Sequence, residues 1–171
     1  MSPKLFGVVG WKNSGKTTLM VGLIGELGGR GLAVSVIKHA HAKFEIDHEG
    51  RDSFRMREAG ACQVALSSPR RFALMRELGA APEMPFEEIL AYAGHCDLVL
   101  VEGFKREAFP KIEIRREGAA SREPLHGAFP QIVAIASDRP QTETESLPTF
   151  HLDDIAGMAD FLVLTLGLRY P

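Results

Sequence analysis

The chain has 171 residues, 45% of them hydrophobic and 25% charged, which fits one globular domain over residues 1–171. The formal net charge of −2 argues against a general nucleic-acid binder, because such proteins are usually basic. The two cysteines form no CxxC pair or disulfide framework, and they favour a reducing, cytoplasmic location. No apolar stretch reaches the length of a signal sequence or a membrane span, so we expect no membrane association.

The first forty residues predict a strand, a helix and a second strand. Residues 5–9 are a valine-rich apolar run, which is typical of a buried strand. Apolar side chains recur at helical spacing from residue 17 to 27, and glycines at positions 28, 29 and 31 are expected to end that helix. Residues 33–37 predict the next strand. This order predicts a βαβ unit with a right-handed crossover.

The rest of the chain predicts short elements joined by polar connections. In chain order we expect a loop at 38–50, a helix at 51–59, strands at 63–67 and 72–76, a helix at 86–92, strands at 98–101, 111–115 and 132–136, and a helix at 153–166 capped by Asp153. The strand at 111–115 alternates Ile112 and Ile114 with charges, so we expect it to be half exposed. Together these elements predict a three-layer α/β/α fold with a mostly parallel sheet.

The residues after the first strand match a phosphate-binding loop. The pattern GxxxxGK[ST] is met by Gly10, Trp11, Lys12, Asn13, Ser14, Gly15, Lys16 and Thr17, and Thr18 follows. Backbone N–H groups of such a loop point at phosphate oxygens, and the helix that begins there adds its positive end. Lys16 would place a charge on the β- and γ-phosphates, and the Thr17 hydroxyl would ligate Mg²⁺. With its strand and helix, the motif predicts a P-loop NTPase-type fold that binds a nucleoside triphosphate.

An acid ends the most apolar strand of the chain. Glu102 follows residues 98–101, at the carboxyl end of the strand, where open α/β sheets bind their ligands. P-loop proteins place a carboxylate there to hold Mg²⁺ directly or through water. Glu102 is therefore the candidate metal ligand and catalytic residue, with an ordinary surface acid as the alternative. Asp97, at the other end of the strand, is expected to cap or pair.

Asp138 follows the late strand at 132–136, at a position where many GTP-binding proteins read the base. A carboxylate can accept hydrogen bonds from both N1–H and N2–H₂ of guanine. The residues Asp138, Arg139 and Pro140 are equally good turn chemistry. The sequence leaves these two interpretations open.

The loop at residues 38–50 holds His39, His41 and His48 together with Asp47. Imidazoles and carboxylates suit several divalent ions, but this spacing matches no fixed structural zinc pattern. We interpret the segment as a polar loop over the nucleotide, and a metal site is the alternative.

Several motifs in a fixed order give the chain a resemblance to a known family. They are the loop from Gly10 to Thr18, Ile37-Lys38-His39-Ala40-His41, Gly50-Arg51-Asp52-Ser53, Ala59-Gly60-Ala61, Val101-Glu102-Gly103-Phe104-Lys105 and Ala136-Ser137-Asp138. From about residue 4 to 166 the chain resembles the molybdopterin-guanine dinucleotide biosynthesis protein B (MobB) family. The phosphate loop alone would be unspecific, but the His-x-His loop and the Glu-Gly-Phe-Lys strand end are specific.

The resemblance implies a GTP-binding adaptor in molybdenum cofactor biosynthesis, a slow Mg²⁺-dependent GTPase at most. The implied partner is the nucleotidyltransferase that joins GMP to molybdopterin, and direct docking of molybdopterin is left open. By match of motif, residues 10–18 would bind the phosphates, Glu102 the Mg²⁺ and Asp138 the guanine. In the wider class of dimeric P-loop proteins a signature lysine follows the first glycine. Here Trp11 holds that position, so Lys12 receives no catalytic role across a dimer.

The resemblance also implies a homodimer, and two apolar segments agree with it. Residues 72–75 are apolar on both faces of a predicted strand, and Ile112 and Ile114 lie on a strand that we expect near the edge of the sheet. Such strands need cover, which a second copy of the chain would supply.

Two other functions would use the same phosphate loop. A small-molecule kinase needs arginines that close over the phosphates, and Arg70, Arg71 and Arg76 form the cluster that could serve. A metal-insertion GTPase would use the histidine loop to carry its ion. Both remain alternatives to the adaptor.

Overall fold

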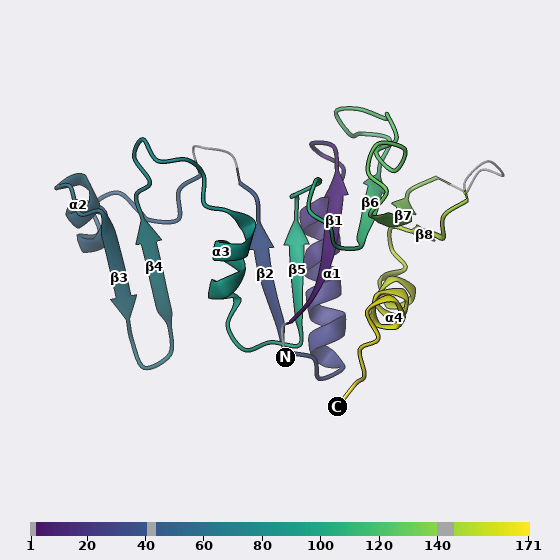
Figure 1. Cartoon of the computed structure of the whole chain (residues 1–171), viewed down its shortest axis with the longest axis horizontal. Helices are drawn as coiled ribbons and strands as arrows, with labels where there is room; N and C mark the ends of the chain where they lie inside the picture. The colour runs from purple at the N-terminus through teal and green to yellow at the C-terminus, as the bar shows by residue number, and fades with distance from the viewer. Residues whose placement is uncertain (1–2, 41–43, 140–145) are drawn as a thin grey trace. The chain divides into compact units, whose positions relative to one another are not determined.

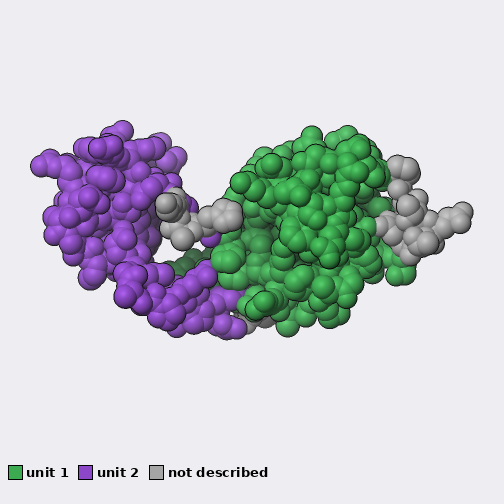
Figure 2. Space-filling view, turned by 90° about the horizontal axis from the view of Figure 1, so that it is seen from above, with its two compact units in different colours: residues 1–39, 89–171 green, residues 40–88 purple. Residues whose placement is uncertain are grey.

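The computed structural model describes residues 3–40, 44–139 and 146–171, which group into two compact units (Figure 2). The first unit comprises residues 1–39 and 89–171, and the second comprises residues 40–88. In the chain, the second unit is thus inserted between two parts of the first. The single domain expected over residues 1–171 stays a prediction.

The elements follow the predicted order, with one added strand near the C-terminus. They are β1 (Lys4–Gly10), α1 (Lys16–Gly29), β2 (Val34–Lys38), α2 (Asp52–Glu58), β3 (Gln63–Ser67), β4 (Phe72–Arg76), α3 (Phe86–Leu90), a 3₁₀ turn (Ala91–Ala93), β5 (Leu98–Glu102), β6 (Lys111–Arg115), β7 (Ile132–Ser137), β8 (Thr149–His151) and α4 (Ile155–Leu166). Strand β8 was not predicted, because three residues are too few to show a periodic pattern.

A six-stranded sheet forms the centre of the first unit, in the order β2-β5-β1-β6-β7-β8 (Figure 1). Every neighbouring pair is parallel, which confirms the predicted α/β fold with a mostly parallel sheet. The register places Val8 of β1 beside Glu102 of β5, and Gly10 beside Ile114 of β6. The carboxyl ends of β5, β1 and β6 therefore meet at the loop that follows Gly10.

Helices α1 and α4 pack on one face of this sheet (Figure 1). Phe6 and Val8 of β1 are buried there with Leu23 of α1 and Leu162 of α4. The opposite face of the sheet is covered near β1 and β7 by the connection between β6 and β7, whose Leu125 joins a smaller apolar cluster. Because β1 is covered on both faces, its position and that of the start of the phosphate loop are fixed.

Strand β6 is central and buried, and the prediction that it is half exposed was wrong. It lies between β1 and β7, with Lys111 0% exposed and Glu113 1% exposed. The Lys111 ammonium donates to the backbone oxygens of Phe109, at 2.9 Å, and Glu107. A charged side chain can be buried when it has such hydrogen-bond partners. The alternation of apolar and charged residues in β6 therefore does not mean that one face of the strand is exposed to solvent.

Three further expectations change with the structure. Ile112 and Ile114 lie in the core, 1% exposed each, and not near an edge, so they need no cover from a second copy. The last helix is capped by Asp154, whose carboxylate accepts a hydrogen bond from the Gly157 N–H at 3.0 Å, and not by Asp153. Helix α1 also continues through the two glycines at 28 and 29 that were expected to end it.

The second unit contains α2 and an antiparallel hairpin of β3 and β4. Arg57 of α2 holds this unit together through three acids, with contacts of 3.3 Å to Glu45, 3.6 Å to Asp47 and 3.2 Å to Glu77. The unit also carries large apolar side chains that are exposed: Phe44, Ile46, Met56, Leu66, Phe72 and Leu78.

Within the described part of the chain, no helix has both the length and the apolar character that crossing a membrane requires.

Candidate nucleotide-binding site

The loop between β1 and α1 has the curled shape that the motif predicts. Asn13 and Gly15 have left-handed φ angles of 64° and 93°, which asparagine and glycine tolerate best. Gly10 lies so close to its neighbours that a Cβ there would be 2.6 Å from the Ser14 Oγ and 2.8 Å from the Ile114 carbonyl oxygen. A glycine is therefore required where the loop leaves the strand, because the loop folds back against β6.

Lys16 lies inside the loop that precedes it. Its Nζ donates hydrogen bonds to the backbone oxygens of Gly10, at 3.1 Å, and Trp11, at 2.9 Å. Partial burial lowers the pKa of Lys16, while the nearby Glu102 carboxylate opposes that shift. The ammonium is thus held within the loop, and phosphate oxygens can replace the two carbonyl oxygens as its hydrogen-bond partners.

Thr17 and Glu102 come together although 85 residues separate them in the sequence. The Thr17 hydroxyl donates to the Glu102 Oε2 at 3.3 Å, and Glu102 is only 8% exposed. Lys38, at the end of β2, lies 3.3 Å from the same carboxylate oxygen. A hydroxyl and a carboxylate that converge in this way are the hard oxygen ligands that Mg²⁺ prefers, so these two residues fit the ion.

These residues line a cavity of about 390 Å³, which also includes Asn13, Gly15 and Thr18. The cavity further includes Arg116, the residue directly after β6. Local sequence pattern does not place Arg116 there, because a short basic pair such as Arg115 and Arg116 is most often a solvated surface feature. The signal that could have found it is its position after the strand that pairs with β1.

The residues after Glu102 lie against the phosphate loop. Lys105 places its ammonium 4.5 Å from the centre of the Trp11 ring, a cation–π contact. Phe104 stacks on His39, with ring centres 4.8 Å apart. The Glu-Gly-Phe-Lys segment is therefore joined both to the phosphate loop and to the end of β2.

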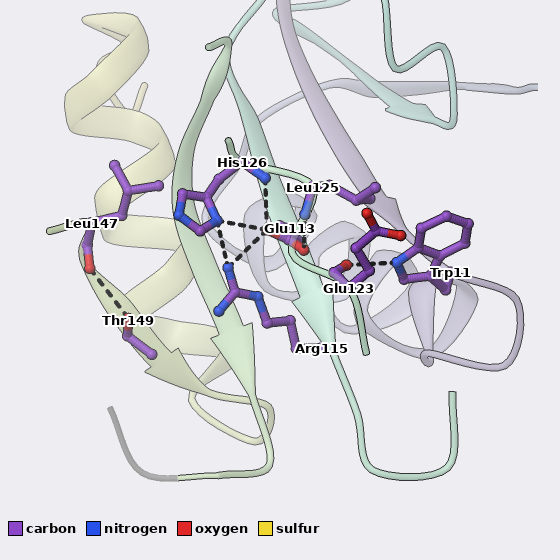
Figure 3. A network of polar contacts seen from close by, with 8 residues as sticks. All are labelled: Trp11, Glu113, Arg115, Glu123, Leu125, His126, Leu147 and Thr149. Carbon is purple, nitrogen blue, oxygen red and sulfur yellow. Dashed lines mark hydrogen bonds and ion pairs between the residues drawn. The ribbon is translucent and has the colours of Figure 1, made fainter. Parts of the chain in front are cut away.

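Trp11 also connects the phosphate loop to the connection after β6 (Figure 3). Its indole N–H donates to the Glu123 carbonyl oxygen at 2.8 Å. The buried carboxylate of Glu113 holds the same connection, because it accepts from the N–H groups of Leu125, at 2.8 Å, and His126, at 3.2 Å. The connection is thus fixed to both β6 and the phosphate loop.

Asp138 lies at the end of β7 and borders two cavities, one beside Trp11 and one beside Ser14. Its Oδ2 accepts a hydrogen bond from the Glu117 N–H at 3.0 Å. The second cavity, of about 270 Å³, continues to His151 at the end of β8 and to Asp153 beyond it. Asp138 therefore faces space beside the phosphate loop, and its reading of guanine stays a prediction.

The other candidate residues are distributed over the two units. His39 directly follows β2 in the first unit, His48 belongs to the second, and His41 lies outside the described residues. Within the ranges 3–40, 44–139 and 146–171, no group of three or more His, Cys, Asp and Glu side chains is arranged to hold a metal. The arginines proposed for a kinase belong to the β3–β4 hairpin, where Arg76 donates to Gln63 at 2.9 Å. Asp97 accepts from the Ala33 N–H at 2.8 Å, a pairing role as expected.

Comparisons with known proteins agree on one family. The model of the family described as molybdopterin guanine dinucleotide synthesis protein B (MobB) matches residues 5–138. The molybdopterin-guanine dinucleotide biosynthesis adapter protein of Escherichia coli (strain K12) is 37% identical over 161 residues, which cover 93% of this chain and 91% of that protein. The adapter protein of the same name from Haemophilus influenzae is 39% identical over 158 residues, 92% of this chain and 86% of the relative.

Solved structures give the same result. The crystal structure of Bacillus subtilis MobB superposes with a TM-score of 0.75 at 29% identity and covers 95% of this chain and 98% of that one. The MobB protein homolog from Bacillus stearothermophilus gives a TM-score of 0.70 at 26% identity, covering 96% and 99%. The segment matched by the family model contains the phosphate loop, Glu102 and Asp138.

Proposed function

Since the chain belongs to the molybdopterin guanine dinucleotide synthesis protein B (MobB) family, we propose that it is a GTP-binding adaptor in molybdenum cofactor biosynthesis. The observation that carries the proposal is the convergence of Lys16, Thr17 and Glu102 in one cavity at the end of β1. That convergence joins a charge for phosphates to two oxygen ligands for a divalent ion.

Each residue of the site has a separate task in this proposal. The loop from Gly10 to Thr18 binds the phosphates through backbone N–H groups, and Lys16 adds its charge. Thr17 and Glu102 hold Mg²⁺, which neutralises phosphate charge when bound. Asp138 accepts hydrogen bonds from guanine, and its loop contact with Glu117 keeps its carboxylate in place.

Binding, more than hydrolysis, is the output that we propose. Fast hydrolysis in this fold class needs a side chain that orients the attacking water. The described residues that line the cavity over the phosphate loop include no glutamine for that task. GTP would then serve to hold one conformation of the protein while its partner acts.

The proposed partner is the nucleotidyltransferase that joins GMP to molybdopterin. The curated relatives are named adapter proteins of molybdopterin-guanine dinucleotide biosynthesis, which supports a partner in that pathway. We also propose a homodimer, because the second unit exposes Phe72 at 69%, Ile46 at 71% and other large apolar side chains.

Calorimetry with purified protein tests the nucleotide part of this proposal. The wild type should bind GTP in the presence of Mg²⁺ and bind ATP more weakly. Affinity chromatography of the nucleotidyltransferase on the immobilised protein, with and without GTP, tests the partner. A wild type that binds neither nucleotide would overturn the proposal.

A further inference from the structure

Arg116 is held beside the phosphate loop by its surroundings. It directly follows β6, the strand in which Ile114 pairs with Gly10. The turn that it begins is bonded to the phosphate loop, because the Ala120 N–H donates to the Lys12 carbonyl oxygen at 2.8 Å. The same turn is bonded to Asp138 through the Glu117 N–H. The backbone of Arg116 thus keeps a fixed distance from the loop.

The side chain of Arg116 borders the space over the phosphate loop. It lines the cavity of about 390 Å³ together with Lys16, Thr17 and Glu102. It also lines the neighbouring cavities beside Trp11 and beside Ser14. Among the described residues, Arg116 alone borders all three of these cavities.

Within the described part of the chain, the charge of Arg116 has no partner. The arginines around it are each paired with a glutamate: Arg115 with Glu113 at 3.1 Å, Arg122 with Glu117 at 3.4 Å and Arg139 with Glu117 at 2.6 Å. The exposed guanidinium of Arg116 makes no ion pair or hydrogen bond within residues 3–40, 44–139 and 146–171. A cation beside a phosphate loop is therefore available to an anion from outside.

We propose that Arg116 is a second phosphate-binding cation of this site, supplied by the chain itself. The proposal rests on the proposed binding of a nucleoside triphosphate. Lys16 provides one point charge, and the charge of Lys38 is shared with Glu102. A triphosphate carries more negative charge than Lys16 and Mg²⁺ neutralise, and a guanidinium binds phosphate oxygens through two parallel N–H donors. Arg116 supplies that missing contact.

Substitution of Arg116 tests the proposal with two probes, GTP and inorganic tripolyphosphate, each with Mg²⁺. Arg116→Ala should weaken both about tenfold or more, because it removes a charge-assisted contact that tripolyphosphate also makes. Arg116→Lys should recover part of the affinity. Arg169→Ala is the matched control, since Arg169 is an exposed arginine of the same unit that lines none of these three cavities, and it should bind both probes like the wild type.

The outcomes separate this proposal from the function on which it rests. A wild type that binds neither probe overturns both. A wild type that binds both, with Arg116→Ala unchanged, overturns the role of Arg116 alone. Loss of GTP binding with tripolyphosphate binding intact also overturns it, because Arg116 would then contact the base or the ribose.

Discussion

Lys16 is the residue on which the proposed nucleotide site depends most directly, because its ammonium lies inside the phosphate loop. Lys16→Ala should lower GTP affinity about tenfold to a hundredfold, the loss expected for one charge-assisted contact of roughly 1.5–3 kcal/mol. Calorimetry measures the change. Lys4→Ala, at the opposite end of β1, is the control and should bind like the wild type. Equal GTP affinity in Lys16→Ala would contradict the phosphate-loop assignment.

If Asp138 accepts hydrogen bonds from guanine, a substitution at this residue should change which base the protein prefers. Asp138→Asn offers one donor and one acceptor, a pattern that fits xanthine, which keeps N1–H but carries an oxygen at position 2. The variant should lose GTP and gain XTP. Its amide oxygen can still accept from the Glu117 N–H, so the loop contact should survive. Competition of GTP, ATP and XTP against a fluorescent nucleotide gives the answer, and a variant that still prefers GTP would show that Asp138 is a turn residue.

The sequence placed Lys16, Thr17 and Glu102 in the site because their positions follow from local rules. A strand, a glycine loop and a helix fix the first two, and the carboxyl end of a buried parallel strand fixes the third. Arg116 could not be placed in this way. Its location depends on β6 pairing with β1, which is a contact between segments about a hundred residues apart.

Helix α4 offers a stability prediction with a control in the adjacent residue. Asp154 caps the helix through the Gly157 N–H, whereas Asp153 has a side chain 92% exposed. Asp154→Ala should lower the free energy of unfolding by about 1 kcal/mol, the usual cost of losing an N-cap. Asp153→Ala should change it by less than about 0.5 kcal/mol. Urea denaturation of both variants distinguishes the two, and equal effects would remove the cap assignment.

Strand β6 predicts a dependence of stability on pH. Burial lowers the pKa of Lys111 from 10.5 to about 8, with Glu107 opposing the shift. Between these two pKa values the unfolded chain holds this proton and the folded protein releases it, so this residue's contribution to stability rises with pH through that window. Below it, both states are protonated and the penalty of burying the charge is complete.

Lys111→Met should remove this dependence, because methionine fills similar space without a charge. Urea denaturation at about pH 7.5 and about pH 10 should show that the variant's advantage over the wild type shrinks as the pH rises. Other groups titrate alike in both proteins, so the difference between them isolates Lys111. A constant difference across this range would refute the buried-charge account.

Elements were predicted best where one periodic pattern governed them. The two hairpin strands β3 and β4 have the predicted bounds, because a turn at Ser68 and Pro69 separates two clear apolar runs. The burial of β6 was not predictable, since its charges find partners at Phe109, Leu125 and His126, in segments whose position the strand's own pattern does not contain. Contacts with other segments, and not the strand's own pattern, determine the burial of β6.

At the scale of the whole molecule, the proposed homodimer predicts a mass of two chains. Light scattering at micromolar concentration should give that mass for the wild type, with and without GTP. Phe72→Glu should give a monomer, because it places a charge on the exposed apolar surface of the second unit. Leu164→Glu, at an even more exposed apolar residue of α4, should leave the dimer intact. A monomeric wild type would exclude the dimer.

The insertion of residues 40–88 has a consequence for how this protein can change over evolutionary time. All six strands that position the phosphate loop come from the other two parts of the chain, and β2 and β5, which flank the insertion in sequence, are hydrogen-bonded neighbours in the sheet. Mutation, lengthening or exchange of the inserted segment therefore leaves the strand register of the nucleotide unit unaltered. Residues 40–88 can therefore diverge under selection while the unit that contains the six-stranded sheet stays conserved.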